Sequence, residues 1–97
     1  ERIAILKMDV QGFELEVLKG GEDTLKRTDI IVLEMQNHRF YKNAPLYYDL
    51  DDFLRRQNFV LYDMIPSIRK SEKLLEWDSI YMSQRFLNEI TKSKSGV

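Results

Sequence analysis

Cysteine is absent from this sequence of 97 residues. Its absence excludes disulfide bonds, a thiolate nucleophile, and any zinc or iron–sulfur site that cysteine would ligate. A chain without cysteine is compatible with a reducing compartment, so we expect a cytoplasmic location.

The sequence also lacks an excess of charge of one sign. It has 15 Lys and Arg residues against 16 Asp and Glu residues, which leaves a formal net charge of -1. Because no excess of positive charge is available to hold a polyanion by counterion release, we expect no nucleic-acid partner.

Long apolar runs are missing as well. The strongest runs, Ile3 to Leu6 and Ile30 to Leu33, are far shorter than the roughly 20 residues needed to cross a bilayer, so we expect no membrane partner. The chain begins at Glu1, without Met and without the pattern of a secretion signal, and we expect it to be part of a longer protein.

The residues that are present favour a folded chain. Hydrophobic residues make up 43% of the sequence and aromatic residues 11%, which is ample for a packed core. The length allows one domain or less.

Strand and helix patterns alternate in the first part of the chain. Residues 3–10 are nearly continuously apolar, which predicts a strand that is covered on both faces. From Phe13 the apolar residues take a helical spacing, but Gly20 and Gly21 interrupt it, which predicts a kink or two short helices. Residues 29–36 repeat the strand pattern.

The middle of the chain continues this alternation. Apolar residues at helical spacing predict a helix over residues 46–57. A third strand is predicted over residues 58–65, where Pro66 should end it because proline cannot donate to a strand ladder. Residues 66–76 are then expected to be a charged connection.

The last strand pattern predicts the fold class. Residues 77–83 alternate polar and apolar side chains and follow the third strand closely, which predicts a hairpin-like antiparallel pair. A short helix is expected around residues 86–90, followed by a frayed end. The order of elements predicts an α/β fold with a mostly parallel sheet and one antiparallel strand.

An ordered motif begins at the end of the first predicted strand. It reads Leu6-Lys7-Met8-Asp9-Val10-Gln11-Gly12-Phe13-Glu14 and continues with Glu16-Val17-Leu18-Lys19-Gly20. This motif resembles the K-x-D-V-x-G-x-E-x-x-V-L-x-G signature of FkbM-type S-adenosylmethionine-dependent methyltransferases. The resemblance extends through residues 31–34, 38–41 and 59–63 to about Ser83.

This resemblance implies the carboxyl-terminal half of a Rossmann-like seven-strand methyltransferase fold. Residues 1–83 would be a partial methyltransferase domain with the fourth through seventh strands, the seventh lying antiparallel between the fifth and sixth, and residues 84–97 would be a tail. The implied activity is methyl transfer from S-adenosylmethionine to a hydroxyl group of a small-molecule or saccharide acceptor.

The cofactor site that the resemblance implies is incomplete. The four glycines, Gly12, Gly20, Gly21 and Gly96, form no G-x-G-x-x-G-like turn after a strand. We therefore expect the main cofactor cradle to come from the missing amino-terminal half or from a complementary chain, and the isolated chain to be inactive.

One acid lies near the carboxyl end of each of the first two predicted strands. Ligands of an open α/β sheet bind beyond the carboxyl ends of its parallel strands, so Asp9 and Glu34 should face one crevice. By the resemblance, Asp9 would lie near the cofactor methyl group and Gly12 would permit the tight turn into the helix. Alternatively, Asp9 binds turn amides, and Glu34 forms an ion pair with Arg39 or Lys7.

Other candidate residues lie close by in the sequence. His38, the one histidine, could act as a general base, and with Asp9 and Glu34 it completes the predicted catalytic set. Glu14, Arg39 and Tyr41 are the predicted substrate contacts. Their alternatives are helix-dipole compensation for Glu14, an ion pair for Arg39, packing under the loop for Tyr41, and a surface position for His38. The spacing of the acids and His38 predicts no metal site.

A non-catalytic function is the competing hypothesis. The exposed edge of the first strand could pair with another chain or with a second copy of this one, so that a degenerate half-domain acts as an association module.

Overall fold

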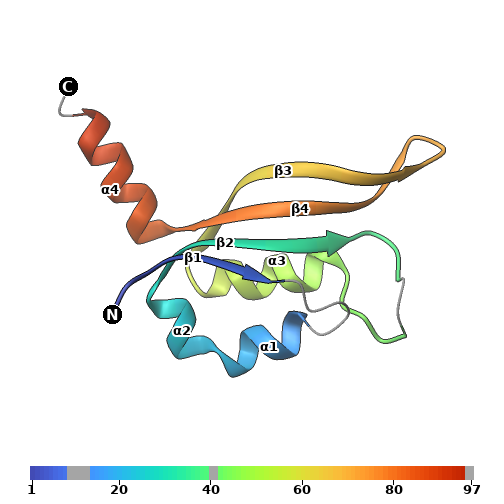
Figure 1. Cartoon of the computed structure of the whole chain (residues 1–97), viewed down its shortest axis with the longest axis horizontal. Helices are drawn as coiled ribbons and strands as arrows, with labels where there is room; N and C mark the ends of the chain where they lie inside the picture. The colour runs from blue at the N-terminus through green and yellow to red at the C-terminus, as the bar shows by residue number, and fades with distance from the viewer. Residues whose placement is uncertain (9–13, 40–41, 96–97) are drawn as a thin grey trace.

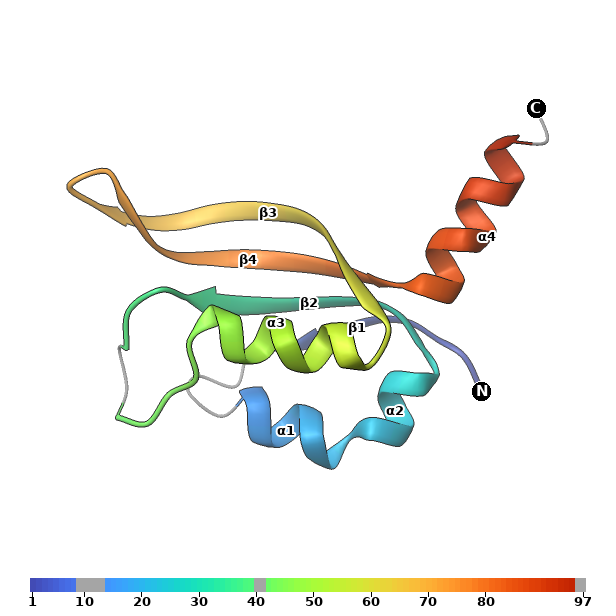
Figure 2. The same cartoon turned by 180° about the vertical axis from the view of Figure 1, so that it is seen from behind.

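The fold is a single sheet with helices on one of its faces (Figures 1 and 2). The computed structural model describes residues 1–8, 14–39 and 42–95. The side chains of Glu14 and of residues 93–95 are outside the described set. Its four strands are β1 (Ile3–Met8), β2 (Thr28–Gln36), β3 (Phe59–Lys70) and β4 (Lys73–Ser83). Its helices are α1 (Glu14–Gly20), α2 (Glu22–Lys26), α3 (Tyr47–Arg56) and α4 (Gln84–Ser95).

The strands follow the order β1-β2-β4-β3 across the sheet. β1 and β2 are parallel, whereas β4 is antiparallel to both β2 and β3. The predicted α/β class and the late antiparallel strand are therefore confirmed. The prediction of a mostly parallel sheet is wrong, because β4 lies between two strands that run opposite to it and makes most of the pairing antiparallel.

The first helical region consists of two short helices, as its glycines predict. α1 ends at Gly20, and α2 begins after Gly21. A Cβ atom on Gly21 would lie 3.3 Å from the carbonyl oxygen of Val17, closer than most such contacts. The chain therefore turns between α1 and α2 at a position where the backbone approaches itself closely.

The β3–β4 hairpin is longer than its sequence predicts. Pro66 lies inside β3 and does not end it, and residues 66–76 contribute to both strands and to the turn, not to a charged connection. β3 is an edge strand, and its pairing with β4 shifts register between Pro66 and Ile68. Proline has no backbone N–H to donate, and it is tolerated at an edge strand or at a register shift because no hydrogen bond to a neighbouring strand is lost there.

The carboxyl-terminal helix is also longer than predicted. α4 starts directly after β4 and not at residue 86. The backbone N–H of Phe86 donates a hydrogen bond to the hydroxyl oxygen of Ser83 at 3.1 Å, the interaction of a helix N-cap. Figure 1 shows α4 projecting beyond the end of the sheet. Among the described residues, no helix is long and apolar enough to span a membrane.

The core lies between the sheet and helices α1 to α3. Ile31, Leu33 and Met35 alternate along β2 and are buried against the cluster that contains Leu50 and Leu54 of α3. Successive side chains of a strand point to opposite faces, so the intervening residues of β2 lie on the uncovered face of the sheet.

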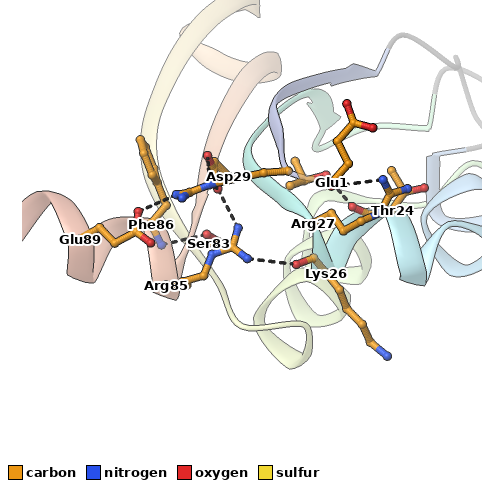
Figure 3. Close-up of polar contacts among 11 residues, drawn as sticks. Glu1, Thr24, Lys26, Arg27, Asp29, Ser83, Arg85, Phe86 and Glu89 are labelled. Carbon is orange, nitrogen blue, oxygen red and sulfur yellow. Dashed lines mark hydrogen bonds and ion pairs between the residues drawn. The ribbon is translucent and has the colours of Figure 1, made fainter.

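An ion-pair cluster joins the residue before β1 to β2 and α4, at the amino ends of the parallel strands (Figure 3). Asp29 is 5% exposed and pairs with Arg2 at 2.8 Å and with Arg85 at 2.7 Å. Arg2 also pairs with Glu89 of α4 at 2.6 Å, and its guanidinium lies 5.7 Å from the ring centre of Phe86. These contacts hold the start of α4 against the sheet.

Candidate functional site

The candidate site begins at the end of the sheet where the carboxyl ends of β1 and β2 lie. The two strands run in parallel, with Met8 paired to Leu33, so their carboxyl ends lie side by side. Asp9 and Gly12 follow β1 and lie outside the described residues, as does Tyr41. Glu14 begins α1, but its side chain is also outside the described set.

Glu34 lies on the sheet face opposite the helices. Its neighbours in β2, Leu33 and Met35, face the buried core, whereas Glu34 is half-buried on the other side. It pairs across the strands with Asp78 of β4, which brings two acidic residues together on this face. The sequence alone does not point to Asp78 as a site residue, because its position beside Glu34 depends on β4 pairing directly with β2.

Acids paired directly across strands repel each other when both are charged. The pair places two carboxyl groups side by side on the uncovered face, near the carboxyl end of β2.

The segment after β2 carries the other predicted residues. His38 and Arg39 are both exposed there. An Arg39 Nη1–H donates a hydrogen bond to the carbonyl oxygen of Ala44, and the Gln36 side-chain amide donates one to the carbonyl oxygen of Pro45 at 3.1 Å. These two bonds close the loop between β2 and α3, so Arg39 has a structural contact within its own loop.

No cluster of His, Asp and Glu side chains that could hold a metal ion occurs within residues 1–8, 14–39 and 42–95 as described.

A second polar group lies on the helix side of the sheet and was not predicted. The Tyr81 hydroxyl donates a hydrogen bond to Asp51 of α3 at 2.5 Å, and Arg55 pairs with the other oxygen of Asp51 at 2.8 Å. Burial, followed by the adjacent Asp51 carboxylate, raises the pKa of Tyr81 above its ordinary value. The hydrogen bond to Asp51 also raises the pKa of Arg55.

This arrangement keeps the Tyr81 hydroxyl protonated and the Arg55 guanidinium charged. Both groups act as donors to one carboxylate, and together they border a cavity between α3 and the β3–β4 hairpin. The helical spacing of α3 predicts that Asp51 faces outward, and only the position of β4 shows that it meets a buried tyrosine.

Comparison with known families identifies the chain. Its sequence matches the family model of the methyltransferase FkbM domain over residues 1–61. The chain belongs to the FkbM methyltransferase family. The match covers β1, both short helices, β2, α3 and the start of β3, and thus includes the motif at the end of β1.

The resemblance read from the FkbM motif is therefore confirmed. No curated protein and no solved structure matches the chain.

Proposed function

We propose that this FkbM-family chain is part of an S-adenosylmethionine-dependent O-methyltransferase that acts on a hydroxyl group of a small molecule or saccharide. The observation that carries the proposal is the family match over residues 1–61, which includes Asp9, Gly12, Glu34 and His38.

The strand order supports a place for the chain in the seven-strand methyltransferase fold. The order β1-β2-β4-β3, with β4 antiparallel, is the order expected for the fourth, fifth, seventh and sixth strands of that fold. Under this proposal, the free edge of β1 is where the remaining strands of the sheet would continue.

The residues at the carboxyl ends of β1 and β2 would bind and orient the reactants. When bound, the cofactor supplies an electrophilic methyl group on a sulfonium cation. A carboxylate suits this cation and the ribose hydroxyls, so the chemistry of Asp9 and Glu34 fits one wall of the cofactor site. The sequence lacks the glycine-rich turn for the rest of the site, and therefore the chain would need another segment to hold the cofactor.

Methyl transfer to oxygen is an in-line displacement, and positioning supplies much of its rate. His38 would accept the proton of the acceptor hydroxyl, since a neutral imidazole nitrogen can act as a general base. Arg39 and Tyr41 would contact the acceptor, with Glu14 at the start of α1 beside them.

Calorimetric titration with S-adenosylmethionine tests the proposal. We expect no detectable binding by the 97-residue chain. Binding should appear when the chain is fused to the strand and glycine-rich turn of another FkbM-family protein. Asp9→Asn in that fusion should weaken binding about tenfold, whereas Asp52→Asn on the exposed side of α3 should leave it unchanged. Micromolar binding by the unfused chain, or a fusion that folds without binding, would contradict the proposal.

The association module is the second candidate function. β1 lies at an edge of the sheet, and Ile5 on this strand is 61% exposed. An exposed apolar edge strand is a template for pairing with another chain. Sedimentation of the chain at increasing concentration tests this function, and a strict monomer at high concentration would rule it out.

A further inference from the structure

A cavity of about 430 Å³ lies between α3 and the β3–β4 hairpin, on the helix side of the sheet. Its volume is within the range of small-molecule sites in proteins. Three of its lining residues are well exposed to solvent: Tyr47 and Met64 at 39% each, and the Arg55 side chain at 57%. A ligand can therefore reach these three side chains without entering the buried core.

One side of the cavity is formed by α3. Tyr47, Asp51 and Arg55 follow each other at intervals of four residues, so they lie along one face of this helix. A rise of about 1.5 Å per residue places the backbones of Tyr47 and Arg55 about 12 Å apart. The cavity therefore has an aromatic ring at the first turn of α3 and a cationic group at the last turn.

The opposite side of the cavity is apolar. It includes Leu61 and Met64 of β3 and Leu74 of β4. Met64 is exposed and the two leucines are half-buried, so all three have apolar surface that a ligand could cover. Because burial of apolar surface is favourable, this wall suits a ligand with a hydrocarbon body.

The guanidinium of Arg55 has unused hydrogen-bond donors. Its Nε–H donates to Asp51 at 2.8 Å, and this is the one hydrogen bond that the group makes among the residues that the structure describes. The Nη1 and Nη2 groups are therefore available to a ligand. By contrast, each carboxylate oxygen of Asp51 already accepts a hydrogen bond, one from Arg55 and one from Tyr81. The available donors favour an anionic acceptor.

Asp51 also orients Arg55. The Tyr81 hydroxyl donates to Asp51 at 2.5 Å, and Tyr81 is 1% exposed, so the carboxylate is held from the core. Asp51 in turn holds the guanidinium through its Nε–H. A binding group that is ordered before the ligand arrives loses less conformational entropy on binding.

We propose that this cavity binds an elongated apolar monocarboxylate, with its hydrocarbon body along Tyr47 and Met64 and its carboxylate on the Nη groups of Arg55. A carboxylate matches the two parallel N–H donors at the end of a guanidinium. The charges of Asp51 and Arg55 compensate each other, so the lining carries no net charge that would repel this ligand. The site does not depend on methyl transfer by this chain.

Calorimetric titration of the whole 97-residue chain with octanoate tests the proposal. We expect saturable binding with a dissociation constant of about 0.1 to 1 mM, in keeping with the small size of this ligand. Octan-1-ol has a hydrocarbon chain of the same length but no carboxylate. It should bind at least about tenfold more weakly, because it cannot form the charged, two-pronged contact with Arg55.

A matched pair of variants on α3 locates the carboxylate. Arg55→Gln removes the guanidinium and should weaken octanoate binding about tenfold. Arg56→Gln breaks the equivalent ion pair with Asp52, but Arg56 lies outside the lining of this cavity, so octanoate should bind as it does to the parent chain. Equal losses of octanoate affinity in the two variants would overturn the proposal.

A second pair of variants, on β3, locates the hydrocarbon body. Met64→Glu places an acid on the apolar wall and should weaken octanoate binding at least about tenfold. Ile68→Glu changes a residue of nearly equal exposure, 40%, that is outside the lining, and octanoate should bind to it as to the parent chain. Equal affinities of these two variants for octanoate would contradict the assigned position of the ligand.

Circular dichroism confirms that each variant is folded before the comparison. If Arg55→Gln does not fold, Arg55→Lys replaces it and should weaken octanoate binding about threefold, because an ammonium group lacks the planar fork. Absence of saturable octanoate binding by the folded parent chain would overturn the proposal, and so would equal affinities for octanoate and octan-1-ol.

Discussion

At the scale of single residues, the free energy of unfolding is most sensitive to single atoms at buried polar groups. Asp29 at the amino end of β2 and Tyr81 near the carboxyl end of β4 are both at least nine-tenths buried, and both are satisfied by partners from distant parts of the chain. Removing the partners of such a buried group leaves it without a hydrogen bond in a place that water does not reach.

Asp29→Asn should therefore destabilise the chain. The substitution removes the negative charge between two guanidinium groups, Arg2 and Arg85. The cost for a fully buried pair is about 3 to 5 kcal/mol. We expect about 2 kcal/mol here because both arginine side chains are roughly half exposed, at 46% and 47%. Urea unfolding measures the change.

The control for Asp29 is Asp52→Asn on α3. Asp52 pairs with Arg56, but both side chains are well exposed, at 64% and 76%. Such pairs contribute little, so the unfolding midpoint should hardly move. Equal losses of unfolding free energy in the two variants would show that the burial of Asp29 does not increase its contribution to stability.

Because of Tyr81, the free energy of unfolding should fall as the pH becomes alkaline. Its pKa is raised in the folded chain, so the folded state disfavours the phenolate. The stabilisation is complete below the unfolded pKa of about 10, and it is lost as the pH rises above that value towards the folded pKa. Urea unfolding across this range should show a decline in the parent chain.

Tyr81→Phe separates this effect from general alkaline unfolding. The variant should lose about 1 kcal/mol at neutral pH, the usual contribution of one hydrogen bond, and its stability should decline less steeply at high pH. Tyr62→Phe, at a tyrosine 59% exposed on β3, should retain the slope of the parent. An unchanged slope in Tyr81→Phe would exclude Tyr81 as its cause.

At the scale of elements, glycines have different roles according to the space around them. A Cβ atom on Gly20 meets nothing within 4 Å, whereas one on Gly21 lies 3.3 Å from the Val17 carbonyl oxygen. Gly20→Ala should stabilise the chain by about 0.5 kcal/mol through helix propensity, and Gly21→Ala should give less or none of this gain. Thermal unfolding of the two variants gives the comparison, and equal gains would contradict it.

The turn of the β3–β4 hairpin contains residues whose substitution by glycine should increase stability. Ser71 and Glu72 connect β3 to β4 with positive φ angles of 50° and 69°. Glycine adopts such angles without a steric penalty, so Glu72→Gly should raise stability by about 0.5 to 1 kcal/mol. Lys70→Gly, at the last residue of β3, should lower it instead. Urea unfolding of both variants distinguishes the turn from the strand.

Local patterns in the sequence predict most elements but not how they pair. The break at Gly20 and Gly21, the strand of residues 29–36 and the helix of residues 46–57 follow from spacing alone, and the structure has them. Pro66 misleads because its effect depends on whether its strand lies at an edge, which the local sequence does not specify.

The candidate sites show the same limit. The motif at the end of β1 predicts the family from contiguous residues. The Glu34–Asp78 pair and the Asp51–Tyr81 hydrogen bond each join residues far apart in the sequence. Both depend on the position of β4, so no local pattern could have predicted them.

At the scale of the whole molecule, the two faces of the sheet differ. Helices α1 to α3 cover one face, while Ile5 of β1 and its partner Ile30 of β2 lie on the other. Ile5→Lys should therefore leave folding nearly unchanged and reduce any self-association, which sedimentation would detect. Loss of folding in this variant would instead show that Ile5 is required within one chain.

The position of β4 also has a consequence for synthesis on the ribosome. The strand made last among the four lies between β2 and β3, and it pairs Ile30 with Met82. Until residues 73–83 have emerged, β2 has no neighbour on that side and β3 has no partner, so the nascent chain can form its early helices but cannot complete the sheet. Premature termination before Lys73 would remove the centre of the sheet and leave two separated edges exposed to aggregation.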